Sequence, residues 1–267
     1  MSLHARFAGV TRVYASAEGR PDVHALGPID LDILRGEFLA VVGPSGCGKS
    51  TFIDVLSGLA APTTGTVSFE NQLLAGEPPD GVGIVFQQDA SFPWLSVRDN
   101  IGFGLKRRRR PASEIARRVD DALRLMGLTD FADAYPAQLS GGMRRRVCIA
   151  RTLVLEPRLI LLDEPFAALD AQTRLLMGDE LLALWRASKA TVVLITHALE
   201  EAALLADRIV VLSARPGRIM EVIPTGWTSD RSSTLLTDPR FGALTARVWS
   251  ALREESLKAL GRHGGAP

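Results

Sequence analysis

One glycine-rich segment constrains the fold of this chain more than any other stretch of its sequence. It reads Gly43-Pro44-Ser45-Gly46-Cys47-Gly48-Lys49-Ser50-Thr51. The apolar run from Phe38 to Val42 precedes it, and a helix-like stretch from Phe52 to Leu56 follows it. Glycines let consecutive backbone N–H groups turn toward an anion, and the following helix directs the positive end of its dipole at the same place. The order of strand, glycine loop and helix therefore predicts a phosphate-binding loop.

Two polar residues near the end of this loop indicate which phosphates it binds. Lys49 is spaced to reach the β- and γ-phosphates of a nucleotide, and Ser50 to place its hydroxyl on Mg²⁺. Gly43 and Gly48 bracket the nest of backbone N–H groups. The alternative is a glycine-rich turn before an ordinary helix, but the flanking strand and helix favour a nucleotide site.

Composition narrows the class of protein. A chain of 267 residues with 46% hydrophobic residues can bury a large core, as one domain or with an inserted subdomain. Its 31 basic and 30 acidic residues leave a net charge of +1. We therefore expect no nucleic-acid partner, because such a chain has no overall basic field. No apolar run approaches the ~18 residues that span a bilayer, and the N-terminus lacks a signal-peptide pattern, so we expect the chain itself not to cross a membrane.

The two cysteines, Cys47 and Cys148, show no metal-ligand spacing and suggest a reduced, intracellular setting. Cys47 stands inside the phosphate loop, next to a helix N-terminus that favours a thiolate. We therefore expect a thiol reagent to label Cys47 in the absence of nucleotide, and a bound nucleotide with Mg²⁺ to shield it.

Short antiparallel strands are predicted between Leu3 and Ile33, followed by strands at 65–69 and 81–86. Tyr14 could stack on an adenine, although an aromatic residue in a strand is more often part of the core. Gln87 follows the strand at 81–86, where a polar side chain can reach a ligand or simply satisfy a loop.

A helical insertion is predicted next. Large apolar residues occupy a turn at Phe92-Pro93-Trp94-Leu95, and helical apolar spacing runs from Ser113 to Met126. The basic run Lys106 to Arg110 between them fits a solvated loop, with contact to anionic lipid headgroups as the alternative.

The second half of the chain alternates between helices and strands. Leu139 to Met143 opens a helix with exposed N–H groups and a hydroxyl, which makes a second candidate phosphate nest. The run at 159–162 reads as a buried strand that ends in Asp163 and Glu164, where ligands bind in open α/β sheets. Asp163 can hold Mg²⁺ and Glu164 can polarise water. Helices at 171–186 and 199–206 and strands at 191–195 and 208–212 complete a largely parallel sheet, with His197 at the same edge.

Taken together, these motifs resemble the ATP-binding cassette subunits of ABC transporters, over nearly the whole chain to about Gly226. Matches occur in family order: Walker A at Gly43 to Thr51, the Q-loop at Gln87, the LSGGQ signature at Leu139 to Met143, Walker B at Leu159 to Glu164, the D-loop at Ala168-Leu169-Asp170, and the switch histidine at His197. Tyr14 falls at the A-loop position. Met143 departs from the usual Gln, but Ser140, Gly141 and Gly142 are intact.

The resemblance implies a fold and a domain organisation. The fold is α/β, with a P-loop NTPase (RecA-like) core, an N-terminal antiparallel β subdomain and an inserted α-helical subdomain. Residues 1–226 would form the ATPase domain, with the helical subdomain inserted at about 88–155, and residues 227–267 a partly helical tail. That tail carries no readable chemistry of its own.

The resemblance also implies the cofactors ATP and Mg²⁺ and a role for each matched residue. Cassettes of the family pair head to tail, so each ATP would lie between one chain's P-loop and the other chain's signature helix. The implied ATP-binding residues are Tyr14, Gly43, Pro44, Ser45, Gly46, Cys47, Gly48, Lys49, Ser50, Thr51, Ser140, Gly141, Gly142 and Asp170. Those near the metal are Ser50, Gln87 and Asp163, and those implied in catalysis are Glu164, His197, Gln87 and Lys49.

A finer resemblance is to import cassettes for nitrate, sulfonates and taurine. It is carried by the sequences from Phe92 to Asn100, Asp163 to Asp170 and Ala214 to Ile219. The tail at Thr237 to Phe241 resembles taurine cassettes more than it resembles many nitrate and sulfonate cassettes. It implies a homodimer on the cytoplasmic face of the cell membrane, which drives permease subunits and, through them, a periplasmic solute-binding protein. The solute itself is chosen by those partners.

Three other readings compete with an importer subunit. A chromosome-maintenance ATPase would need a long coiled-coil insertion, for which the interval between Lys49 and Gly141 is too short. A translation factor with tandem cassettes would need a second P-loop and a second signature. A nucleotide-gated scaffold would lack a general base, which Glu164 supplies. A cassette ATPase that is not coupled to transport stays open as the alternative function.

Overall fold

The computed structural model describes the chain apart from residues 1, 17–20, 88–89, 168 and 264–267, and for residues 260–263 only the backbone is described. A sheet in the order β10-β9-β3-β8-β7-β6 forms the centre of the molecule. Its strands are β3 (Phe38–Val42), β6 (Val82–Val85), β7 (Leu159–Asp163), β8 (Thr191–Ile195), β9 (Arg208–Leu212) and β10 (Ile219–Pro224). Strands β9, β3, β8, β7 and β6 run parallel, and β10 pairs antiparallel with β9. The predicted parallel sheet is confirmed.

The central strands are largely apolar because both faces of the sheet are covered. All five residues of β3 are buried. Phe38, Ala40 and Val42 belong to one apolar cluster, whereas Leu39 and Val41 belong to the cluster on the opposite face. This alternation follows from the two-residue period of a strand.

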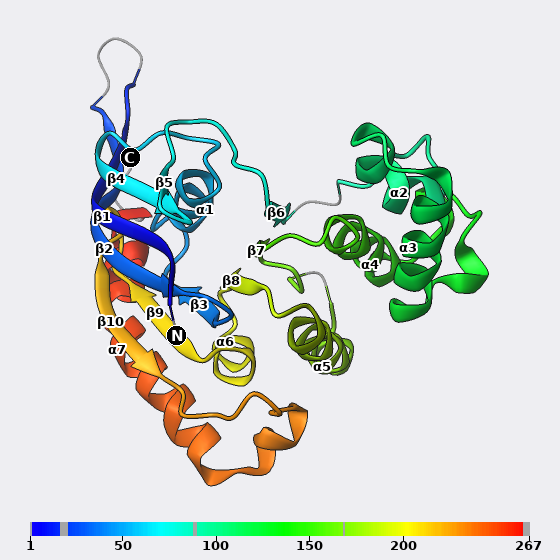
Figure 1. Ribbon diagram of the computed structural model, residues 1–267. Coiled ribbons are helices and arrows are strands. Elements are labelled where there is room, and N and C mark those ends of the chain that lie inside the picture. Colours follow the sequence, from blue (N-terminus) through cyan, green and yellow to red (C-terminus); the bar gives the residue numbers. More distant parts are fainter. Residues whose placement is uncertain (1, 17–20, 88–89, 168, 264–267) are drawn as a thin grey trace.

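An antiparallel sheet covers one face of the parallel sheet together with α1 (Lys49–Leu56), on the left of Figure 1. It comprises β1 (Leu3–Tyr14), β2 (Val23–Leu34), β4 (Thr64–Phe69) and β5 (Gln72–Leu73), in the order β2-β1-β4-β5. Phe7 of β1 stacks on Phe52 of α1 with ring centroids 4.5 Å apart. The predicted antiparallel pairing is confirmed, but β1 and β2 are long strands of 12 residues each.

Three helices lie together on the opposite side of the molecule (Figure 1). They are α2 (Val97–Arg107), α3 (Ala112–Leu125) and α4 (Gly141–Leu153), with the short 3₁₀ helices η1 (Thr129–Phe131) and η2 (Pro136–Gln138) before α4. Ser96 caps α2 by accepting a hydrogen bond from Asp99 N. The basic run was predicted as a loop, but Lys106 and Arg107 form the last turn of α2, where cations suit the helix dipole.

The remaining helices cover the second face of the parallel sheet. They are α5 (Ala171–Ser188), α6 (Leu199–Leu205) and α7 (Pro239–His263), with the 3₁₀ helix η3 (Ser233–Thr237) before α7. Helix α7 buries Phe241, Val248 and Leu252 in the cluster that contains β9. Among the described residues, no helix is both long enough and apolar enough to cross a membrane.

Candidate active site

The parallel strands bring the predicted motifs to one edge of the sheet. β3 leads into the phosphate loop, β6 into Gln87, and β8 into His197, while Asp163 is the last residue of β7. Parallel strands end at the same edge, which is where ligands bind in open α/β sheets.

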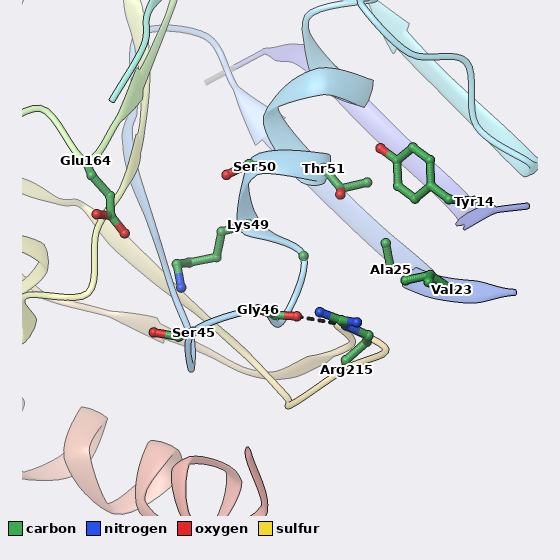
Figure 2. Close-up of a pocket in the computed structure, with 11 residues that line it drawn as sticks. Tyr14, Val23, Ala25, Ser45, Gly46, Lys49, Ser50, Thr51, Glu164 and Arg215 are labelled. Carbon is green, nitrogen blue, oxygen red and sulfur yellow. Dashed lines mark hydrogen bonds between the residues drawn. The ribbon is translucent and has the colours of Figure 1, made fainter. Parts of the chain in front are cut away.

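A cavity of about 340 Å³ opens beside the phosphate loop. It is lined by Tyr14, Val23, Ala25, Ser45, Gly46, Gly48, Lys49, Ser50, Thr51, Glu164 and Arg215. Figure 2 shows Lys49 and Glu164 on one side of the loop and Tyr14, Val23 and Ala25 on the other. Lys49 and Glu164 therefore lie at one end of the cavity and the Tyr14 ring at the other, with Arg215 on the Tyr14 side of Gly46.

The phosphate loop depends on glycines at two positions. Gly46 and Gly48 have φ angles of 72° and 108°, which favour glycine. A Cβ on Gly48 would lie 2.5 Å from the Ala25 carbonyl oxygen, so the loop also needs glycine to fit against β2. Gly48 stands at the start of α1, whose first N–H groups are available to an anion.

The side chain of Lys49 is held in place by two carbonyl oxygens of the phosphate loop. Its Nζ donates hydrogen bonds to the carbonyl oxygens of Gly43 at 2.8 Å and Pro44 at 3.0 Å. Gly43 and Pro44 are not part of the cavity lining, and they contribute by holding this ammonium group. A phosphate in the cavity would offer the ammonium a charged partner in place of two neutral carbonyls, which is a stronger hydrogen bond.

The predicted reactivity of Cys47 is wrong. Its side chain is only 1% exposed and does not line the cavity, because it packs behind the loop in the apolar cluster of β3 and α1. Burial raises the pKa of the Cys47 thiol, and the opposing effect of Lys49 is smaller. The helix N-terminus does not yield a thiolate here because the thiol is removed from solvent. Cys47 is therefore a core residue whose backbone shapes the loop.

Tyr14 lines the end of the cavity opposite Glu164, with Val23 and Ala25 of β2 beside it. The Arg12 guanidinium lies over the Tyr14 ring, 4.5 Å from its centroid. This cation covers one face of the ring and restricts its position, so the cavity side offers an aromatic and apolar surface of the kind that suits a planar base.

Ser50 lines the cavity and Asp163 ends β7 next to Glu164, and both have side-chain oxygens that could bind a metal ion. The Asp163 carboxylate is 9% exposed, and the Ser50 hydroxyl is close enough to influence its pKa. Burial raises the pKa of Asp163, the nearby carboxylates of Glu164 and Asp54 add to the rise, and Ser50 opposes it. Hydroxyl and carboxylate oxygens are the ligands that Mg²⁺ prefers, so these residues fit the ion that the fold family implies.

Glu164 contacts two of the other predicted catalytic residues, Gln87 and His197. Its Oε2 accepts a hydrogen bond from Gln87 Nε2 at 2.9 Å, and its Oε1 lies 3.3 Å from His197 Nδ1. The Glu164 backbone has a φ of 44°, an unfavourable conformation for a residue with a side chain, which its N–H supports by bonding to Ile195 O. Such strain is typical of functional positions.

A buried network holds the segment that carries His197. Glu201 is 6% exposed, accepts a hydrogen bond from Thr196 Oγ1 at 2.5 Å, and lies 3.3 Å from Arg174 Nε. Arg174 in turn donates from Nη2 to the Leu169 carbonyl at 3.1 Å. The position of His197 is thereby tied to the loop that precedes Asp170.

Arg145 of α4 connects the helices α2–α4 to the catalytic edge of the sheet. The side chain is 7% exposed, and its guanidinium donates to the carbonyl oxygens of Pro165 at 2.6 Å and Asp163 at 3.2 Å. It also donates to the carbonyl of Phe86, the residue after β6. One side chain therefore supports the ends of both β6 and β7.

The signature residues lie away from the cavity in this chain. Ser140 is exposed, caps α4 and accepts a hydrogen bond from Met143 N at 3.3 Å, and Gly141 and Gly142 form the first turn. Asp170 caps α5, where its Oδ1 accepts from Gln172 N and Thr173 N. Neither group is in the cavity lining given above, and Ala168 of the predicted D-loop lies outside the described residues. The departure at Met143 has a physical reason, because its side chain packs against the apolar core.

Arg215 is a cavity residue that the sequence did not reveal as one. The segment Ala214 to Ile219 contributed to the finer resemblance, but nothing in its spacing indicated a contact with the phosphate loop. The contact arises because β9 lies next to β3, so the segment after β9 passes beside the loop after β3. Val23 and Ala25 were missed for the same reason, since β2 approaches α1 only in three dimensions.

Comparison with known proteins identifies the family. The family model described as ABC transporter matches residues 26–167. The nitrate import ATP-binding protein of Synechocystis is 38% identical over 94% of this chain and 96% of its own length. The taurine import ATP-binding protein of Jannaschia is 45% identical over 74% of this chain and 73% of its own. The spermidine/putrescine import ATP-binding protein of Nitratidesulfovibrio vulgaris is 48% identical over 75% of this chain and 55% of its own.

The fold is also that of solved cassettes. A dimeric ATP-binding cassette in a post-hydrolysis state, bound to ADP and Pi, is 31% identical and superimposes with a TM-score of 0.74. The match covers 84% of this chain and 100% of that one. The predicted P-loop NTPase fold is thus confirmed, and the chain belongs to the ABC transporter family as one of its ATP-binding, ATP-hydrolysing cassettes.

Proposed function

We propose that this protein is the ATP-hydrolysing subunit of an importer, and that two copies pair head to tail around ATP. The observation that carries the proposal is the split site of a single chain. The phosphate loop and Glu164 share one cavity, whereas Ser140 is exposed, Gly142 is half-buried, and neither lines that cavity. A second copy would bring its signature helix to the open side of the cavity, and the solved relative bound to ADP and Pi is a dimer.

Hydrolysis in this site rests on positioning and charge. Lys49 would neutralise the phosphates, and Glu164 would orient the attacking water and accept its proton, with His197 beside the γ-phosphate. The contact between Gln87 Nε2 and Glu164 Oε2 fixes the carboxylate and leaves Oε1 on the His197 side. Mg²⁺, held by Ser50 and Asp163 with Gln87 nearby, would supply further positive charge to the phosphates.

An exposed aromatic cluster marks the surface that we assign to a membrane permease. Phe92 contacts Trp94 and Phe103, with ring centroids 5.6 Å and 4.6 Å away, and Arg151 covers its ring at 4.8 Å. The Trp94 side chain is 71% exposed, although it is large and apolar. Aromatic residues of this kind are frequent anchors in protein interfaces. Through this contact the cassette would sit on the cytoplasmic face of the cell membrane.

Trp94→Ala is expected to weaken copurification with the permease about tenfold or more, because an exposed aromatic anchor carries much of an interface's free energy. The permease would be the one that copurifies with the wild-type cassette. Trp249→Ala is a matched control, since Trp249 is 51% exposed but lies on α7. Unchanged assembly and transport by Trp94→Ala would remove the cluster from the docking surface.

The solute is proposed to be a small anion such as taurine, another aliphatic sulfonate or nitrate. The named nitrate and taurine relatives support this. The spermidine/putrescine relative is 48% identical over 203 residues, compared with 45% over 197 residues for the taurine relative and 38% over 257 residues for the nitrate relative. The choice of solute would be made by a periplasmic solute-binding protein acting through the permease. The cassette itself would not contact the solute, and only its rate of ATP hydrolysis would respond to it.

ATP hydrolysis by the reconstituted importer is expected to rise with taurine or nitrate and to stay unchanged with spermidine. The measurement is phosphate release from proteoliposomes that contain cassette, permease and solute-binding protein. Stimulation by spermidine would overturn the anion assignment. A rate of ATP hydrolysis that changes neither with any solute nor with the permease would favour the alternative, a cassette ATPase not coupled to transport.

A further inference from the structure

Arg215 is a cation in the nucleotide cavity to which no motif assigns a role. It belongs to the segment between β9 and β10, outside the residues that the family model matches. Its Nε donates a hydrogen bond to the Gly46 carbonyl at 3.1 Å, and Nη2 lies 3.2 Å from where a Cβ on Gly46 would stand. The guanidinium is therefore placed against the middle of the phosphate loop.

The position of Arg215 along the cavity indicates which part of a nucleotide it faces. Figure 2 shows the side chain beyond Gly46, on the side of Val23 and Ala25 and away from Glu164. Glu164 and Lys49 mark the end at which the γ-phosphate would be cleaved, and Tyr14 marks the end for the base. A group between Gly46 and Ala25 lies toward the phosphate nearest the ribose.

The charge of the cavity agrees with a phosphate contact at this point. The ionisable acids and bases in its lining, apart from Tyr14, are Lys49, Arg215 and Glu164. Among the described lining residues, Lys49 is the cation at the catalytic end, so without Arg215 the other end would offer only backbone N–H groups and the Thr51 hydroxyl. Arginine binds phosphate oxygens with a planar fork of donors and is charged at all relevant pH values.

Helix α7 fixes the backbone next to Arg215. Glu255 is 5% exposed, and its Oε2 accepts a hydrogen bond from Ala214 N at 2.8 Å. Gly217 N bonds to Ala25 O at 3.0 Å, and Gly27 N to Gly217 O at 3.0 Å. The segment 213–217 is thus held between α7 and β2, which leaves little freedom for the base of the Arg215 side chain.

We infer that Arg215 binds the α-phosphate of the nucleotide, and that Glu255 of α7 is a positioning residue which acts through the Ala214 backbone to place it. The inference rests on the proposed binding of ATP in this cavity. It gives the C-terminal helix a part in nucleotide binding, through a chain of contacts from Glu255 to Ala214 to Arg215 and the phosphate loop.

The test measures the dissociation constants of Mg-ADP, and of Mg-ATP in a Glu164→Gln background, by calorimetry on the full chain. Arg215→Ala is expected to weaken both nucleotides by a similar factor of about ten, since the lost contact is charge-assisted and both carry an α-phosphate. The side chain is exposed, so the variant is expected to fold. Arg218→Ala is the matched control, because Arg218 is exposed on the same segment but does not line the cavity.

Two outcomes of that measurement would overturn the inference. One is unchanged affinity of Arg215→Ala for both nucleotides while Lys49→Ala loses binding. The other is a loss confined to ATP, which would move the contact to the γ-phosphate. Wild-type affinity in Lys49→Ala would instead refute the cavity as the ATP site, and with it the proposed function.

The role of Glu255 is tested by a double-mutant cycle. Glu255→Ala is expected to weaken Mg-ADP binding about threefold, and to add nothing in the Arg215→Ala background, because contacting groups that act as a unit are not additive. Glu255→Gln keeps an oxygen acceptor for Ala214 N and is expected to restore most of the affinity. An equal loss in both backgrounds, or no rescue by glutamine, would show that Glu255 does not act through Arg215.

Discussion

Glu164→Gln is expected to bind Mg-ATP with near wild-type affinity and to hydrolyse it about 10²- to 10⁴-fold more slowly, the contribution that general bases typically make. The amide can still accept the hydrogen bond from Gln87 Nε2 through its oxygen, so the shape of the site is kept. The NH₂ group of the amide then faces His197 and the water in place of Glu164 Oε1, and this group cannot accept a proton.

The decisive measurement is single-turnover phosphate release, with nucleotide affinity recorded in parallel. Glu156→Gln serves as the control, because Glu156 is an exposed carboxylate paired with Arg118 and does not line the cavity. Near wild-type turnover by Glu164→Gln would take the base role away from Glu164. A loss of binding together with turnover would instead mean that the substitution had distorted the loop.

Mixing Lys49→Ala with Ser140→Arg is expected to restore hydrolysis that neither variant shows alone. The first variant has a damaged phosphate loop and an intact signature helix, and the second has the reverse. A head-to-tail homodimer of either contains only damaged sites. In the mixed dimer, the intact loop of the Ser140→Arg chain meets the intact signature of the Lys49→Ala chain, which makes one complete site.

Single-turnover hydrolysis, measured before and after mixing, tests this arrangement. Ser140 is exposed and outside its own chain's cavity, so arginine there should leave the fold and nucleotide binding by the loop intact. Partial recovery supports sites that are shared between chains. Full hydrolysis by Ser140→Arg alone would rule out a part for the signature of the second chain. Recovery is reduced if the two sites are strictly coupled, so the behaviour of Ser140→Arg alone is the decisive outcome.

Elements with a strong local signal were predictable from the sequence. The strand predicted at 191–195 is β8 with the same bounds, because a parallel strand that is buried on both faces reads as a nearly continuous apolar run. The convergence of Gln87, Glu164 and His197 was also predictable, since each follows a strand of one parallel sheet. Such inferences need only periodicity and the direction of the strands.

Features that depend on packing between distant segments were not predictable. The sequence around Cys47 favoured a reactive thiolate, but only the structure shows that its side chain turns into the apolar cluster. Arg215 reaches Gly46 across a sequence separation of 169 residues, and no local pattern carries that information. The basic run Lys106 to Arg110 was predicted as a solvated loop, but Lys106 lies in α2 and its Nζ pairs with Asp99 Oδ1 at 2.6 Å.

The position of Arg145 has a consequence for how movement could pass between the permease and the ATP site. Its guanidinium ties α4 to carbonyl groups at the ends of both β6 and β7, so any displacement of α4 at this point would break charge-assisted hydrogen bonds in a buried setting. A rotation of α2–α4 against the sheet costs least if its axis passes close to Arg145, because atoms on an axis do not move. Arg145 would then lie at the pivot of the rotation, and the displacement of atoms in α2–α4 would increase with their distance from it.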